Sequence, residues 1–106
     1  MAEIVHLNMP VSLVGIWRSD EDDARSEYHV RIQDGQLTVS ARDFIDGERY
    51  VVSNVSHDQG RVEFDTFMPS TSRTGHVTLI ATNSRERAEI CFTFTDVGFM
   101  ARHTGD

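Results

Sequence analysis

The stretch "EYHVRIQDGQLTVSAR", residues 27 to 42, decides the fold class of this chain. Apolar and polar residues alternate on both sides of a central Asp34-Gly35, as they do along strands that bury one face. Asp-Gly is a preferred dipeptide for a two-residue hairpin turn, because both turn positions require positive φ. We therefore predict an antiparallel hairpin with its turn at Asp34-Gly35.

The register of this hairpin can be tested on both of its faces. With a two-residue turn, apolar residues pair across the strands as Ile32–Leu37, Val30–Val39 and Tyr28–Ala41. On the opposite face Glu27 then lies across from Arg42, a favourable pair of opposite charges. A slip of one residue would move every side chain to the other face, so only this register gives two sensible faces.

Alternation continues along most of the remaining chain. A second two-residue turn is expected at Asp46-Gly47, with Ala41 opposite Val52 and Asp43 opposite Tyr50. A three-residue turn with a left-handed Gly60 is expected next, although Val55 breaks the alternation before it. A last hairpin, with its loop at 83–86, pairs Leu79 with Ile90 and Val77 with Phe92.

The number and spacing of the segments predict the architecture. No stretch shows a convincing helical period, and a loop is expected at 69–75. Six strands are clear, and two more are expected at 12–18 and 99–103. We predict one all-β domain, residues 1–106, in which an antiparallel up-and-down meander forms a small barrel or half-barrel.

Composition excludes several classes of partner. The chain has ten basic residues, all of them arginine, and 17 acidic residues, which gives a formal net charge of −7. Such a charge argues against nucleic acid and anionic membranes as partners. Cys91 is the single cysteine, so no intramolecular disulfide forms, and the first ten residues do not resemble a signal peptide. We expect a cytoplasmic protein.

One short motif carries a resemblance to a known family. Gly15-Ile16-Trp17 opens a strand at the start of the meander, and Arg102 lies near the end of the chain. This arrangement resembles the calycin superfamily, the lipocalins and their relatives. The resemblance implies a lipocalin-like antiparallel barrel in which Arg102 packs over the indole of Trp17. It also implies an interior that binds small apolar molecules.

The leading functional hypothesis is binding of a small, mainly apolar ligand against the aliphatic face of the sheet. The residues expected to line that site are Tyr28, Val39, Phe64, Leu79 and Phe92. One alternative is an enzyme that uses His29 or Asp43 as an acid or base. The alternation of residues along its strand places Asp43 on the apolar side, where burial would raise its pKa. Another alternative is a structural module that buries its sheet against a second copy.

Metal binding and self-association are the remaining questions. No two of the histidines have the short spacing typical of metal ligands; they are His6, His29, His57, His76 and His103. We expect no metal and no cofactor. We predict a homodimer, since no helix is available to cover the aliphatic face of an open sheet. The alternative is a barrel that closes within one chain and stays monomeric.

Overall fold

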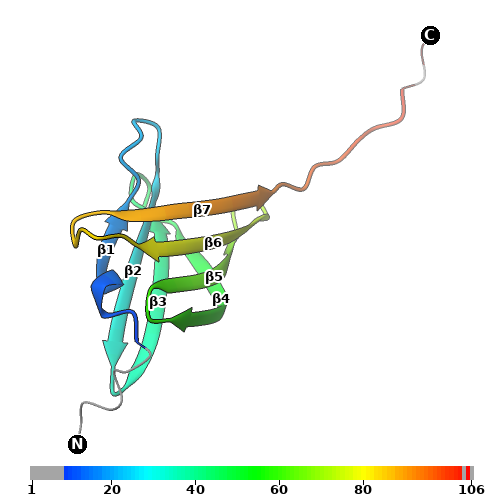
Figure 1. The fold of residues 1–106 in the computed structure, drawn as a ribbon. Helices are drawn as coiled ribbons and strands as arrows, with labels where there is room; N and C mark the ends of the chain where they lie inside the picture. The colour runs from blue at the N-terminus through cyan, green and yellow to red at the C-terminus, as the bar shows by residue number, and fades with distance from the viewer. Residues whose placement is uncertain (1–8, 104, 106) are drawn as a thin grey trace, which may run out of the picture.

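Seven antiparallel strands form one meander that curls into a half-barrel (Figure 1). The computed structural model describes residues 9–103 and 105. Each strand pairs with the next one along the chain, which confirms the predicted all-β meander. The elements are a 3₁₀ turn η2 (Val11–Leu13) and the strands β1 (Gly15–Arg18), β2 (Ser26–Gln33), β3 (Gln36–Asp43), β4 (Arg49–Asp58), β5 (Arg61–Met68), β6 (Arg73–Ala81) and β7 (Ala88–Thr95).

The β2–β3 hairpin has the register predicted from the sequence. Its two-residue turn places Asp34 at φ 53° and Gly35 at φ 77°, the positive values that a primed turn requires. All the predicted pairs are present, including Glu27 opposite Arg42. The last hairpin is also confirmed, with Leu79 opposite Ile90.

The predicted pairing around Asp46-Gly47 is wrong by two residues. Ala41 lies opposite Tyr50 rather than Val52, and the Asp43 amide donates to the Glu48 carbonyl over 2.8 Å. The loop is longer because the Asp43 carboxylate accepts hydrogen bonds from the next backbone amides and holds four residues in the turn. A shift of two residues leaves every side chain on its predicted face.

The turn after β4 also differs from the prediction. Asp58 pairs with Arg61, so the turn has two residues, and Gly60 is not left-handed. The irregularity lies earlier, at Asn54, whose φ is 54° and where the β4–β5 register shifts. This β-bulge explains why Val55 breaks the alternation, because the extra residue of a bulge reverses the parity beyond it.

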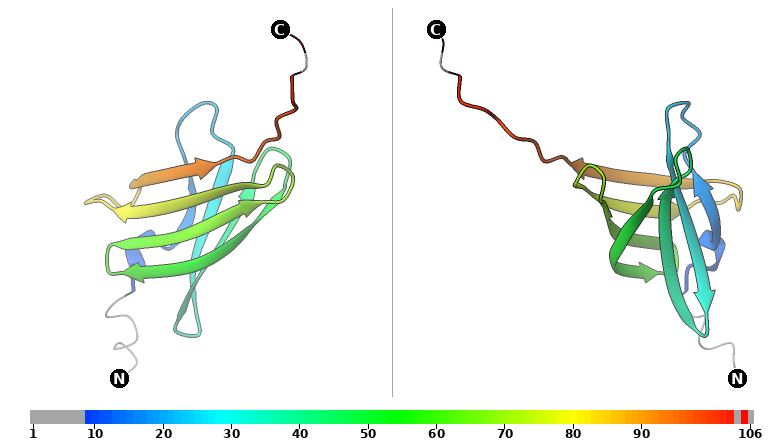
Figure 2. Two further views of the ribbon diagram at one scale, coloured as in Figure 1. Left: turned by 90° about the vertical axis from the view of Figure 1, so that its right-hand side faces the viewer. Right: turned by 180° about the vertical axis from the view of Figure 1, so that it is seen from behind.

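The sheet folds over so that its two halves pack face to face. β4 pairs with β3 only through its first two residues and then with β5, and the later strands cross over the earlier ones (Figure 2). The Tyr28 and Phe64 rings meet edge to face between the halves, with their centroids 5.4 Å apart. The buried hydrophobic core is Leu13, Tyr28, Val30, Ala41, Tyr50, Val62, Phe64, Val77 and Leu79.

The two ends of the described chain differ from expectation. The predicted strand at 99–103 is absent, and the tail leaves the body at the end of β7 (Figures 1 and 2). Arg102 is exposed on this tail and does not cover Trp17. Instead, Trp17 Nε1 donates to the Leu13 carbonyl over 2.8 Å, which ties β1 to the preceding turn. No described segment is a helix long and apolar enough to cross a membrane.

Candidate functional site

A cleft of about 530 Å³ opens at one end of the half-barrel. The loops after β1, β3 and β5 form its rim, and β7 forms one wall. Its apolar surface comes from residues on the inner face of the sheet: Tyr28, Met68, Ile90, Phe92 and Phe94. The cleft is therefore an open continuation of the core rather than a separate surface hollow.

The aromatic wall on β7 depends on a close approach to β6. Phe92 and Phe94 lie with their ring centroids 5.2 Å apart, and Phe92 remains 51% exposed. Phe94 lies across from Gly75, where an added Cβ would come within 2.8 Å of the ring. The missing side chain at Gly75 thus lets the Phe94 ring lie against the sheet.

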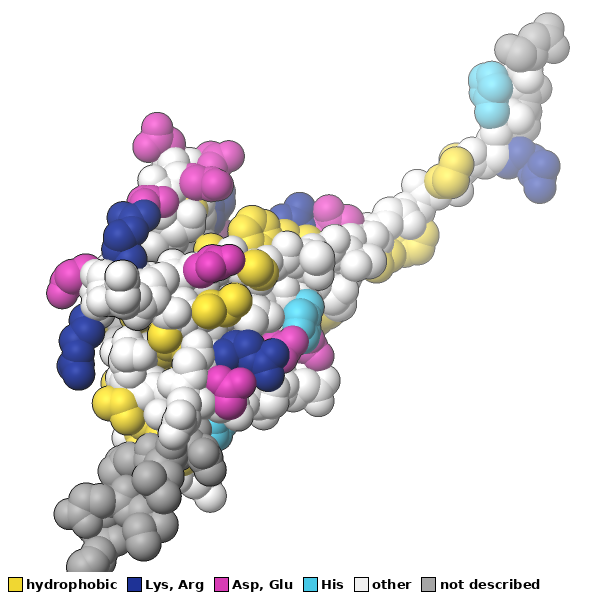
Figure 3. All heavy atoms as spheres, in the orientation of Figure 1, with side chains coloured by type: hydrophobic (Ala, Val, Ile, Leu, Met, Phe, Trp, Pro, Cys, Tyr) yellow, Lys and Arg dark blue, Asp and Glu magenta, His cyan; other side chains and the backbone are white. Residues whose placement is uncertain are grey.

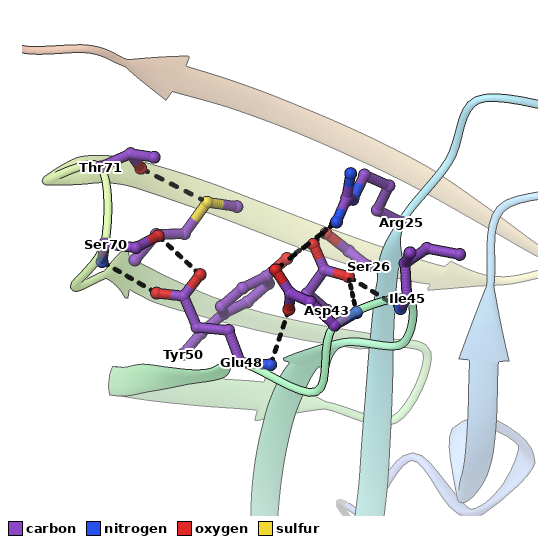
Figure 4. A network of polar contacts seen from close by, with 10 residues as sticks. Arg25, Ser26, Asp43, Ile45, Glu48, Tyr50, Ser70 and Thr71 are labelled. Carbon is purple, nitrogen blue, oxygen red and sulfur yellow. Dashed lines mark hydrogen bonds and ion pairs between the residues drawn. The ribbon is translucent and has the colours of Figure 1, made fainter.

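Asp43 is held at the rim as an ionised carboxylate. Its Oδ2 accepts from Arg25 Nε over 2.8 Å, and its Oδ1 accepts from the amides of Ile45 and Asp46 (Figure 4). Burial alone would raise the pKa of Asp43, but the hydrogen bonds from Arg25 and the two amides outweigh it, so the pKa is lowered. The expected raised pKa is therefore wrong, although Asp43 does lie on the apolar side of its strand.

Hydroxyl groups line the cleft beside this carboxylate. Tyr50 Oη and Ser26 Oγ lie 3.2 Å apart, and burial raises the pKa of both Tyr50 and Tyr28, so both phenols stay neutral at pH 7. Across the rim, Glu48 accepts hydrogen bonds from the amide and hydroxyl of Ser70, joining the loops after β3 and β5 (Figure 4). These contacts fix the shape of the rim.

Arg73 closes the far side of the cleft. Its guanidinium lies over the Phe94 ring, 5.3 Å from the centroid, and pairs with both oxygens of Asp96 at 2.6 and 3.1 Å. This pairing lowers the pKa of Asp96 and raises that of Arg73. The arginine charge is thus neutralised beside the aromatic wall.

The structure separates the five residues predicted to line a ligand site. Tyr28 and Phe92 line the cleft. Phe64 is fully buried in the core, and Val39 is half-buried against it. Leu79 lines a smaller hollow of about 180 Å³ between β1 and β7, which Tyr28 also borders. The alternation of residues along the strands identified the correct face of the sheet, but it does not predict which part of that face stays open to solvent.

A buried ion cluster lies on the outer face of the sheet, where Glu27 was predicted to pair with Arg42. Glu27 is only 2% exposed, because Arg18, Arg42 and His29 all donate to its carboxylate over 2.6–2.8 Å. Hydrogen bonds from Arg42, His29 and Arg18 lower its pKa to about 2. Arg18 also lies over the Phe44 ring, 4.0 Å from its centroid. His29, the other candidate acid or base, is thus a partner of Glu27.

A second polar cluster joins β5 to β6 on the same outer face. His76 lies between two carboxylates, with Nδ1 2.7 Å from Asp65 and Nε2 2.6 Å from Glu63. Asn54, the bulge residue, donates to the other oxygen of Asp65 over 2.7 Å. Hydrogen bonds to Asp65 and Glu63 raise the pKa of His76. Within residues 9–103 and 105, no group of His, Cys, Asp and Glu is arranged to hold a metal ion.

Comparison with protein-family models, curated proteins and solved structures found no match to this chain.

Proposed function

We propose that this protein binds a small, mainly apolar ligand in the cleft at the open end of the half-barrel. The observation that carries the proposal is a cleft of about 530 Å³ with an aromatic wall and a polar rim. Ligand pockets commonly have volumes of ~300–1,000 Å³ and combine apolar walls with a few polar groups. Phe92, at 51% exposure, offers apolar surface that a ligand would cover.

The charges at the rim favour a neutral or cationic ligand over an anionic one. Both arginines that line the cleft, Arg25 and Arg73, already pair with carboxylates of this chain. Glu21 and Asp23 also line the cleft, and neither carboxylate pairs with a cation in the described part of the chain. An anion would meet this negative rim without a free guanidinium to bind it.

The test is retention and titration of small molecules. Native mass spectrometry of freshly purified protein should detect a retained small molecule. Titration with the neutral probe N-phenyl-1-naphthylamine should give saturable fluorescence, and the anionic probe 1-anilinonaphthalene-8-sulfonate should bind more weakly. Phe92→Ala should weaken binding of the neutral probe about tenfold, since a well-covered aromatic side chain contributes ~1.5 kcal/mol or more.

Phe67→Ala is the matched control for this experiment. Phe67 is 38% exposed, but it lies on the opposite face of the sheet from the buried residues of β5. This variant should bind the neutral probe as the unchanged protein does. Equal binding by both variants, or no saturable binding at all, would contradict the proposal.

We also propose a calycin-like relationship and a cytoplasmic setting. The half-barrel, with Gly15 and Trp17 on its first strand, supports the relationship. The exposure of Arg102 on a tail outside the sheet counts against it. The free thiol of Cys91 supports a reducing compartment, where such thiols stay unpaired.

A further inference from the structure

The half-barrel has a gap between its first and last strands. β1 and β7 are the two ends of the sheet, and neither has a second neighbouring strand in the described part of the chain. The two edges are close at one end, where Arg87 Nη2 lies 2.9 Å from Asp20 Oδ2. The hollow of about 180 Å³ between them is walled by Trp17, Ala88 and Ile90. The gap is therefore narrow and partly apolar at this end, and β1 and β7 diverge from there (Figure 1).

The chain beyond β7 carries apolar side chains that cover nothing in this structure. Val97 is 59% exposed, Phe99 99% and Met100 100%. Figure 3 shows hydrophobic side chains on this extended tail, followed by a basic side chain and a histidine. Exposed apolar side chains in sequence on an extended segment are typical of a strand that binds another surface.

The direction in which the strand runs decides whether the gap is filled by the tail of the same chain or by the tail of a second copy. A strand that continues the antiparallel pattern of this meander runs antiparallel to β7. The chain continues past Thr95 without a turn or bend, so its own tail runs away from the gap. A second copy, related by a two-fold axis near Phe94, would bring its tail alongside the first half of β7 in the antiparallel direction.

We infer that residues 97–102 of one copy form the strand that closes the half-barrel of a second copy, so that the protein is a tail-swapped dimer. In this arrangement each tail lies along β7 of the partner and crosses the end of β1, over the hollow beside Trp17. Six extended residues span ~20 Å, which matches most of the eight-residue length of β7. The inference does not depend on the proposed ligand.

Charge complementarity supports the same arrangement. The apolar part of the tail is followed by Arg102 and His103. Running antiparallel to β7, these residues would reach the end of the gap where Asp20 and Glu86 line the hollow. Acidic side chains also gather on the loop between β1 and β2, at the top of Figure 3. The basic end of the tail therefore meets an acidic surface.

Sedimentation equilibrium of the full chain at micromolar concentrations tests the inference. The chain has a mass of 12.0 kDa, and we expect a species of twice that mass. Phe99→Asp should convert it to the monomer, because a carboxylate would enter the apolar gap. Ile45→Asp is the matched control, since Ile45 is 64% exposed on a loop away from the gap, and this variant should remain dimeric. Arg102→Glu should weaken association.

Trp17 gives an independent readout, because the only tryptophan lines the gap. Its emission should shift to longer wavelength as the protein is diluted and the partner's tail departs. In Phe99→Asp the emission should not depend on concentration. A single 12.0 kDa species throughout, including one in which the tail folds back within one chain, would overturn the inference. A dimer that persists in Phe99→Asp would overturn it equally.

Discussion

Replacing Gly75 with alanine would test how the aromatic wall of the cleft is held in place. A Cβ at this position would lie 2.8 Å from the Phe94 ring and 2.7 Å from Thr66 Oγ1. Real Cβ atoms essentially never make contacts under 3.0 Å, so at least one neighbour must move. Thr66 is only 4% exposed, so the Phe94 ring, at 37%, is the group with room to shift.

Two opposing effects decide the sign of the change. A glycine inside a strand destabilises the folded protein by ~0.5–1 kcal/mol relative to alanine, so backbone entropy alone predicts that Gly75→Ala stabilises the protein. Overpacking a well-filled site costs ~1–3 kcal/mol. Because the two contacts are far inside normal separation, overpacking should dominate. We expect a net loss of ~1–2 kcal/mol in the free energy of unfolding.

Urea unfolding followed by Trp17 fluorescence measures this change, and a double-mutant cycle with Phe94→Ala assigns it. Without the Phe94 ring the added methyl group has more room, so Gly75→Ala should cost at least ~0.5 kcal/mol less. Gly60→Ala is the control, since a Cβ added at Gly60 would have no neighbour within 4 Å and its φ is not positive. A stabilised Gly75→Ala protein, or strict additivity with Phe94→Ala, would refute the packing argument.

Three further substitutions have definite expected outcomes. Gly35→Val should lower the free energy of unfolding by at least ~1 kcal/mol, because a β-branched residue resists a φ of 77°; an unchanged urea midpoint and slope would contradict the turn assignment. Glu27→Gln should lower the urea midpoint at pH 7. It should also flatten the acid unfolding curve, since the stability contributed by ionised Glu27 is present above its unfolded pKa of 4.5 and is lost as the pH falls through about 2. The pKa of His76 in the folded protein is raised above 6.5. The stability that protonated His76 contributes is therefore complete below pH 6.5 and is lost as the pH rises through the folded pKa. NMR titration of its ring should show this pKa moving back towards 6.5 in Asp65→Asn.

The strands and most of their faces could be predicted from the sequence because alternation and turn chemistry are local signals. Asp34-Gly35 sets its own register, and the pairs on either side follow from a period of two. The same logic failed at Asp46-Gly47 because the Asp43 side chain competes for the turn amides. That competition depends on geometry beyond the dipeptide, so residue type alone did not reveal it.

The candidate site was less accessible to sequence reasoning, because it depends on how far the sheet curls. Parity places Tyr28, Phe64 and Phe92 on one face, yet the fold buries Phe64 fully and leaves Phe92 half open. Nothing in the spacing of these residues distinguishes them. The difference arises because the two halves of the sheet cross and cover each other near the middle strands, where Phe64 lies on β5. The wall formed by β7, which carries Phe92, stays uncovered.

Glu27 and His76 show why outer-face polar residues resist prediction. Both alternate with buried residues and both pair across strands, so their patterns in the sequence are equivalent. Glu27 nevertheless becomes buried, since long arginine side chains from two neighbouring strands fold over it from either side. His76 meets only shorter carboxylates and stays about half exposed. The reach of the cross-strand partner, rather than the parity of the residue itself, determines which polar side chain on the outer face is removed from solvent.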